Sequence, residues 1–146
     1  MNYSTRLTWS GNRGSGTSAY TSYGREFRAG IDGKPDIDGS ADPAFRGDGQ
    51  KHNPEDLLLV AVAACHMLTY LALCARNGIR VLDYSDDASG VMNGKQFEEI
   101  TLHPFVTIAS DSDADRAAAL HDAAHESCFI ANSCNFPIHH RAEIRS

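Results

Sequence analysis

The chain has few basic residues, few cysteines and no apolar leader, and each absence excludes a class of protein. Its 13 lysines and arginines are outnumbered by 19 aspartates and glutamates, and the resulting net charge of −6 argues against nucleic acid as a partner. Four cysteines in 146 residues are too few for a secreted scaffold held by disulfides. The opening residues, MNYSTRLTWSG, contain no apolar signal core. We therefore expect a cytoplasmic protein with reduced thiols.

Long apolar runs are also missing. The longest extends from Leu57 to Ala64 and is too short and too quickly broken to span a bilayer, so we expect no membrane association. The composition, 42% hydrophobic and 22% charged, is that of an ordinary globular protein. A chain of 146 residues is long enough to bury a core without disulfides, and we expect a single domain over residues 1–146.

One stretch carries a full set of helix signals. Asn53 is a good N-cap, and Pro54 occupies the first helical position, where its missing N–H costs nothing. Glu55 and Asp56 then place negative charge at the positive end of the helix dipole. At the other end Gly78 can adopt the left-handed cap. These signals predict a helix over residues 53–78.

This helix has no polar face over Leu57–Ala64, so it must be buried nearly all round. At about 1.5 Å per residue it spans roughly 36 Å. That length is too great for the interior of one 146-residue chain to cover comfortably.

The rest of the chain alternates between extended and helical patterns. The predicted strands cover residues 3–9, 18–28, 34–38, 79–92, 97–109 and 137–144. Asn93-Gly94 is a strong hairpin signal, and Pro104 suggests an edge or a bend within its strand.

A second, alanine-rich helix is predicted over residues 113–127, with Ser110 or Ser112 as its cap. A short helical turn is expected within residues 128–136. The order of strands, long helix, strands, helix and strand places the fold in the α+β class.

The cysteines differ in their surroundings. Cys65 and Cys74 lie nine residues apart on one helix, on opposite faces, and cannot form a disulfide with each other. Cys74 is therefore expected to be a small buried hydrophobe if Cys65 faces the chemistry. Cys128 follows Ser127 at a predicted helix start, where the helix dipole favours a thiolate.

Two motifs together carry a resemblance to a known family. NPEDLLLVAVAAC, followed some sixty residues later by AHESCFIANSCNFPI, resembles the OsmC/Ohr family of osmotically induced and organic-hydroperoxide-resistance proteins. The similarity covers essentially the whole chain. It implies an OsmC-like fold in which sheets wrap around a long central helix, assembled as an intertwined homodimer with active sites at the subunit interface.

The resemblance also implies roles for particular residues. Cys65 would be the peroxidatic thiol and Cys128 the resolving thiol. Glu55 would pair with an arginine that also steadies the Cys65 thiolate. Arg46, in FRGDGQ, is the expected arginine, and Arg13 in the glycine-rich turn is the alternative.

The implied function is a thiol-dependent peroxidase that reduces organic hydroperoxides in defence against oxidative stress. Its cycle would pass through a Cys65–Cys128 disulfide, which an external dithiol then reduces, and it needs no bound cofactor or metal. Whether Cys134 competes as the resolving thiol stays open. An apolar lining that favours alkyl or lipid hydroperoxides is expected from Leu58, Val62, Met67 and Phe129.

Two other functions are compatible with the sequence. His121, His125 and Cys128 are spaced to lie along one helical face as zinc ligands, with His139 or His140 completing the set. Alternatively, the protein is a non-catalytic dimer that uses the same interfacial pocket to bind an apolar ligand.

Overall fold

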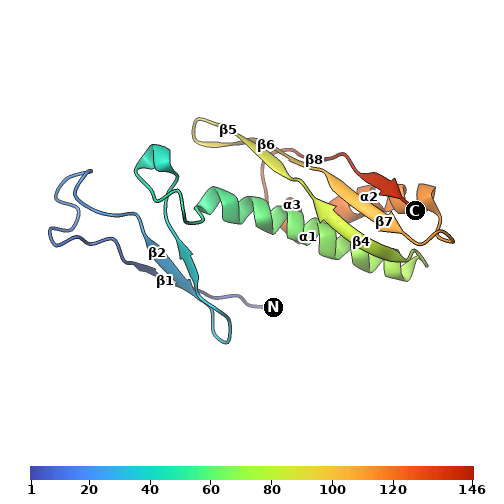
Figure 1. Cartoon of the computed structure of the whole chain (residues 1–146), viewed down its shortest axis with the longest axis horizontal. Coiled ribbons are helices and arrows are strands. Elements are labelled where there is room, and N and C mark those ends of the chain that lie inside the picture. Colours follow the sequence, from blue (N-terminus) through green and yellow to red (C-terminus); the bar gives the residue numbers. More distant parts are fainter. The chain divides into compact units, whose positions relative to one another are not determined.

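The computed structural model describes all 146 residues, which form two compact units, residues 1–57 and residues 58–146. Each unit is described by itself. The first contains an antiparallel sheet in the order β1-β2-β3, drawn in blue to cyan in Figure 1. Its strands are β1 (Arg6–Trp9), β2 (Phe27–Gly30) and β3 (Ile37–Gly39). A short 3-10 helix, η1 (Pro43–Phe45), follows them.

The predicted return strand over residues 18–28 is wrong for most of its length, because β2 begins only at Phe27. The residues before it form a compact loop instead. The Arg25 guanidinium lies over the rings of Tyr20 and Tyr23, at 4.5 and 3.8 Å from their centroids. The Trp9 indole N–H donates to the Gly24 carbonyl at 2.8 Å. These side-chain interactions, together with the backbone hydrogen bond from the Gly24 N–H to the Gly11 carbonyl at 2.8 Å, hold the loop.

The long helix, α1 (Pro54–Arg76), confirms the sequence prediction at both ends. The Asn53 side chain accepts a hydrogen bond from the Asp56 N–H at 2.8 Å, as an N-cap does. Gly78 has a φ of 71°, the left-handed conformation that terminates helices at little steric cost.

The second unit contains two three-stranded sheets, and in both an antiparallel pair is extended by a parallel third strand. One has the order β4-β7-β9 and the other β5-β6-β8 (Figure 1). Their strands are β4 (Val81–Asp86), β5 (Ser89–Asn93), β6 (Gln96–Leu102), β7 (Pro104–Ile108), β8 (Ile138–His140) and β9 (Glu143–Arg145).

The hairpin and bend signals are confirmed, and the last strand is corrected. Asn93 ends β5 and Gly94, with φ 62°, forms the turn into β6. The strand expected over residues 97–109 divides at His103, so that Pro104 begins β7 in the other sheet. The strand expected over residues 137–144 is two short strands, β8 and β9, one in each sheet.

Two further helices complete the unit, α2 (Ala114–Ser127) and α3 (Phe129–Asn132). The predicted caps of α2 are wrong. Asp113 is the N-cap, and its carboxylate accepts from the Arg116 N–H at 3.0 Å. Ser112 is used elsewhere, because its hydroxyl accepts from the Arg80 N–H at 3.0 Å.

The second unit has two hydrophobic clusters, one for each sheet. The first joins α1, α2 and the β4-β7-β9 sheet through Tyr70, Cys74, Ile79, Val106, Ile108, Ala117, Leu120 and Ala124. The second joins α1 to the β5-β6-β8 sheet through Val62, Phe97, Ile100, Leu102 and Ile138. α1 therefore contributes to both cores, as expected of an α+β fold built around a long helix.

The chain itself covers only one face of α1. Its buried residues, Val62, His66, Tyr70 and Cys74, follow a four-residue spacing. Val60 and Leu68, on other faces, are both 62% exposed. The expectation of burial on all sides is therefore not met within a single chain.

By length and composition alone, α1 is long and apolar enough to cross a membrane. This corrects the expectation, drawn from the Leu57–Ala64 run, that no segment could span a bilayer. A single helix of this kind is weak evidence for a membrane span. The central helix of a soluble protein has the same length and composition.

Replacing Ile100 with alanine should destabilise the second unit. The Ile100 side chain is 0% exposed within the second cluster, so Ile100→Ala leaves a cavity and should lower the free energy of unfolding by about 2–5 kcal/mol. Urea unfolding measures the change. The control is Glu98→Ala on the same strand, where the side chain is exposed. Equal stability of the two variants would contradict the assigned core.

Candidate active site

Cys65 lies in the middle of α1, on a half-buried face. The four-residue stripe that faces the core passes through His66 and Cys74 and leaves Cys65 off it, because neighbouring residues on a helix point about 100° apart. The two α1 cysteines therefore have different surroundings, as the sequence predicted. Cys74 is 1% exposed and belongs to the first hydrophobic cluster.

Cys128 lies at the junction of α2 and α3. Its backbone N–H donates to the His125 carbonyl, and its side chain is the N-cap of α3, where Sγ accepts from the Ala131 N–H at 3.5 Å. The predicted helix start at this cysteine is confirmed. The side chain is 1% exposed.

The structure brings these two thiols into hydrogen-bond contact, although they lie on helices far apart in the sequence. Burial of Cys65 raises its pKa, but hydrogen bonds from Cys128, from the backbone N–H groups of Ile130 and Phe129, and from Thr69 lower it, and the net shift is downward. Burial, together with the bond to Cys65, raises the pKa of Cys128 to about 11. The pair is asymmetric: the protonated form is favoured for Cys128, and the ionised form is favoured for Cys65.

All four cysteines are free thiols. Cys134 follows α3 and its C-cap Ser133, and its thiol donates to the Ile130 carbonyl at 3.2 Å. Burial raises its pKa. The Ile130 backbone therefore contacts both thiols, with its N–H directed to Cys65 and its carbonyl to Cys134.

The residues expected to support the thiolate lie in the first unit. Arg46 follows η1 as its C-cap, with a φ of 64°, and its side chain is exposed. Glu55 is in the first turn of α1 and makes no ion pair within the chain. Arg13, the alternative arginine, is already paired with Glu26 at 3.0 Å.

The expected apolar lining needs one correction. Val62 is 0% exposed inside the second cluster, so its side chain is enclosed by the core and cannot line a substrate pocket. Phe129, beside Cys128, is 74% exposed.

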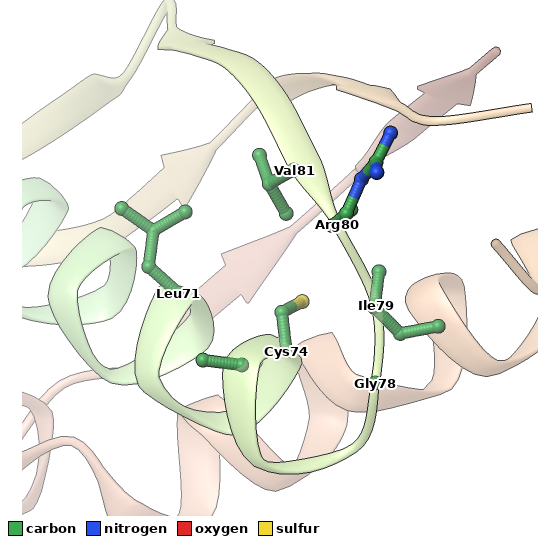
Figure 2. Close-up of a pocket in the computed structure, with 7 residues that line it drawn as sticks. Leu71, Cys74, Gly78, Ile79, Arg80 and Val81 are labelled. Atoms are coloured by element: carbon green, nitrogen blue, oxygen red, sulfur yellow. The ribbon is translucent and has the colours of Figure 1, made fainter.

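A pocket of about 470 Å³ lies elsewhere, at the end of α1, where the chain turns into β4 (Figure 2). The Cys74 side chain points from the helix toward the segment around Ile79 and Val81. The residues lining the pocket are Leu71, Cys74, Ala75, Gly78, Ile79, Arg80 and Val81. Neither Cys65 nor Cys128 contributes to it, and burial raises the pKa of the Cys74 thiol.

The zinc arrangement expected at His121, His125 and Cys128 does not form. No three histidine, cysteine, aspartate or glutamate side chains make a group that could hold a metal ion. The reason is that His121 faces His66 on α1, with Nδ1 of His121 at 3.0 Å from Nε2 of His66, while Cys128 faces Cys65.

The histidine pair is buried between α1 and α2. His66 and His121 are each 1% exposed, and the Tyr70 ring stacks on His121 with a centroid separation of 3.8 Å. His140, on β8, stacks on His66 at 5.6 Å. The Nε2 atom of His121 is buried with no hydrogen-bond partner. Sequence inspection could not find this pair, since its members are separated by 55 residues.

Burial holds both histidines neutral. It lowers the pKa of His66 to about 4, with His140 and His125 adding repulsion. It lowers the pKa of His121 to about 3, with His66 and His140 adding repulsion.

The family model for OsmC-like proteins matches residues 47–143. The chain belongs to the OsmC-like family. The matched range includes Glu55, Cys65 and Cys128, whereas Arg46 lies just before it.

Similar proteins agree with this assignment. An OsmC-like protein of unknown function from Vibrio cholerae O1 biovar eltor str. N16961 has a structure that superposes with a TM-score of 0.87 at 27% identity, covering 98% of this chain and 99% of that one. An organic hydroperoxide resistance protein OsmC from Legionella pneumophila gives a TM-score of 0.69 at 19% identity, over 100% and 98% of the two chains, and supports the fold alone.

A curated relative is the uncharacterized protein YmaD of Bacillus subtilis (strain 168). It is 29% identical over 94 residues, which is 60% of this chain and 63% of that protein.

The OsmC-like protein should lose stability as the buried pair His66 and His121 becomes protonated. In the unfolded chain these histidines take up protons near pH 6.5, whereas in the folded chain they do so only near pH 4 and pH 3. The stability that the two neutral histidines contribute is therefore fully present above pH 6.5 and is lost as the pH falls below it. The free energy of unfolding should decrease by up to about 1.4 kcal/mol per pH unit for each histidine. Urea unfolding between pH 7 and pH 5 measures this, in a range where carboxylates with ordinary pKa values change little. Asp86, whose pKa burial raises, is the exception and acts in the opposite direction.

The double variant His66→Leu/His121→Leu should show a much weaker pH dependence over that range. His139→Gln, which alters a half-exposed imidazole on β8, is the control and should keep the wild-type slope. Equal slopes in the double variant and in the wild type would contradict the assignment.

Proposed function

We propose that this OsmC-like protein is a thiol-dependent peroxidase that reduces organic hydroperoxides in defence against oxidative stress, acting in the cytoplasm as a homodimer. The observation that carries the proposal is the hydrogen-bonded contact between Cys65 and Cys128, whose pKa values shift in opposite directions. A peroxidatic thiol must be ionised to attack, and a resolving thiol must wait protonated beside it. Membership of the OsmC-like family supports the same chemistry.

In the first step the Cys65 thiolate attacks the terminal oxygen of the hydroperoxide. The O–O bond breaks, Cys65 becomes a sulfenic acid, and the leaving alkoxide takes a proton and departs as an alcohol. The N–H groups of Phe129 and Ile130 favour the thiolate before the attack. The exposed Phe129 ring, beside the pair, offers an apolar contact suited to alkyl or lipid hydroperoxides.

In the second step Cys128 condenses with the sulfenic acid, forming a disulfide and releasing water. Part of the raised pKa of Cys128 comes from its hydrogen bond to Cys65 and from the charge there. Oxidation of Cys65 removes that charge, so the pKa of Cys128 falls and the resolving thiolate forms more readily. An external dithiol then reduces the disulfide and restores both thiols.

Arg46 and Glu55 complete the proposed machinery. Arg46 steadies the thiolate, and Glu55 orients the arginine, as the family resemblance implies. Arg13 is the less suitable arginine, because its guanidinium already has a carboxylate partner in Glu26.

The homodimer rests on the uncovered faces of α1. Within the chain, only 22% of the most apolar 18-residue stretch of this helix is buried. A second copy that packs against these faces would remove the exposed Val60 and Leu68 side chains from water, which is favourable at about 25 cal/mol for each Å² of apolar surface. No nucleic acid or membrane partner is proposed.

The peroxidase cycle predicts a specific disulfide. After one equivalent of cumene hydroperoxide, mass spectrometry should find a Cys65–Cys128 bridge in the wild type. Cys128→Ser should instead carry sulfenic or overoxidised Cys65, and Cys65→Ser should be inert. Cys134→Ser is the control and should still form the bridge. A wild-type protein that neither consumes the hydroperoxide nor forms the bridge would favour the ligand-binding hypothesis.

The dimer predicts a single assembled species in sedimentation without detergent at micromolar concentration. Val60→Glu and Leu68→Glu place a charge on the uncovered faces of α1 and should shift the protein toward monomer. Met92→Glu, on the exposed strand β5, is the control. A stable, folded wild-type monomer would refute the dimer, and a requirement for detergent would point to a membrane instead.

A further inference from the structure

Thr69 lies one helical turn beyond Cys65 on α1, where residues four positions apart share a face. Its hydroxyl donates to the Cys65 carbonyl oxygen at 2.8 Å and also lies within hydrogen-bond reach of the Cys65 thiol. Threonine commonly bonds its own helix backbone in this way. Here the residue that supplies the carbonyl is also the proposed nucleophile.

The bond to the carbonyl is not needed to satisfy that group. Within an α-helix the Cys65 carbonyl already accepts the backbone N–H of Thr69, four residues later. The hydroxyl is therefore a second donor to an oxygen that has a partner without it. Transferring the hydroxyl hydrogen bond elsewhere leaves no buried group unsatisfied.

The two possible acceptors differ in strength once the thiol ionises. A hydrogen bond to an ionised acceptor is roughly twice as strong as one between neutral groups. Since the hydroxyl hydrogen turns about the Cβ–Oγ1 bond, it can pass from the carbonyl to the sulfur without movement of a heavy atom.

We propose that Thr69 stabilises the Cys65 thiolate by turning its hydroxyl from the Cys65 carbonyl to the Cys65 sulfur when the thiol loses its proton. In the resting thiol the same oxygen can accept the S–H. This inference rests on the proposed peroxidase function, which needs the thiolate, but the hydrogen bond itself can be tested without any peroxide.

The test is the pH dependence of alkylation by iodoacetamide, which reacts with thiolates. Tryptic peptide mapping follows Cys65 and Cys74 together, because both lie between Lys51 and Arg76. Thr69→Val keeps the shape of the side chain and removes the hydroxyl. It should slow alkylation of Cys65 at pH 7 by about three- to tenfold and shift the profile to higher pH, with an unchanged rate at the alkaline plateau.

Two variants and one internal reporter make the result specific. Thr69→Ser, which restores a hydroxyl, should return the profile toward the wild type. Thr107→Val makes the same change on β7, at a half-buried position between the buried Val106 and Ile108, and should leave the profile unchanged. Cys74, which is 1% exposed, should stay unreactive if the fold is retained. If it becomes reactive in Thr69→Val, Thr69→Ala provides the same loss of hydroxyl without the β-branched side chain.

The outcomes separate this inference from the proposed function. A shifted profile in a protein that does not consume cumene hydroperoxide would support the role of Thr69 and reject the peroxidase. Hydroperoxide consumption by the wild type, with an unshifted profile in Thr69→Val, would overturn the role of Thr69 alone. A change in plateau rate without a shift along the pH axis would also overturn it, because that pattern reports access to the sulfur.

Discussion

The hydrogen bond between the Cys65 and Cys128 thiols is the interaction on which the proposed chemistry of this protein depends. Two buried thiols without partners would both have raised pKa values and would be poor nucleophiles. Their contact, together with donors from the start of α3, shifts the pKa values of the two thiols in opposite directions. One thiol becomes easier to ionise and the other harder, which gives the two cysteines the different acidities that the proposed cycle requires.

This contact requires α1 and α2 to dock in one position, and buried polar contacts set that position. The Tyr70 hydroxyl on α1 donates to the Ala117 carbonyl on α2 at 3.0 Å, and His66 meets His121 at 3.0 Å. Apolar packing alone tolerates small slides between helices, whereas a buried hydrogen bond is lost if its partners move apart. Because α2 leads directly into Cys128, the same contacts place the second thiol.

The local features of the fold could be predicted, since they depend on neighbouring residues. Asn53, Gly78 and the Asn93-Gly94 turn gave the long helix and a hairpin, because caps and turns are decided within a few residues. The cap of α2 was missed because Asp113 and Ser112 both suit the position, and Ser112 is used instead by a residue more than 30 positions away.

In the candidate site, too, local features could be predicted and long-range contacts could not. The family resemblance carried by the two motifs implied Cys65 and Cys128, and the helical repeat alone would have pointed to Thr69. The pairing of His66 with His121 has no local signal, because neighbouring layers of the fold create it. The choice between Arg46 and Arg13 as the proposed partner of the thiolate also depends on contacts that no short stretch of sequence encodes.

The parallel third strands have a consequence for how this protein folds. β8 pairs with β6, and β9 pairs with β7, in each case about 40 residues further along the chain, whereas β5 and β6 are joined by a tight turn. Because closing such long loops is slow, we expect the local hairpin to form first. The edges of β6 and β7 then stay unpaired until β8 and β9, which lie close together in the sequence, add a strand to each sheet. During that interval β6 and β7 each present an unpaired backbone edge. We therefore expect the two sheets to be completed together, and we expect the folding chain to be exposed until then to edge pairing with other molecules.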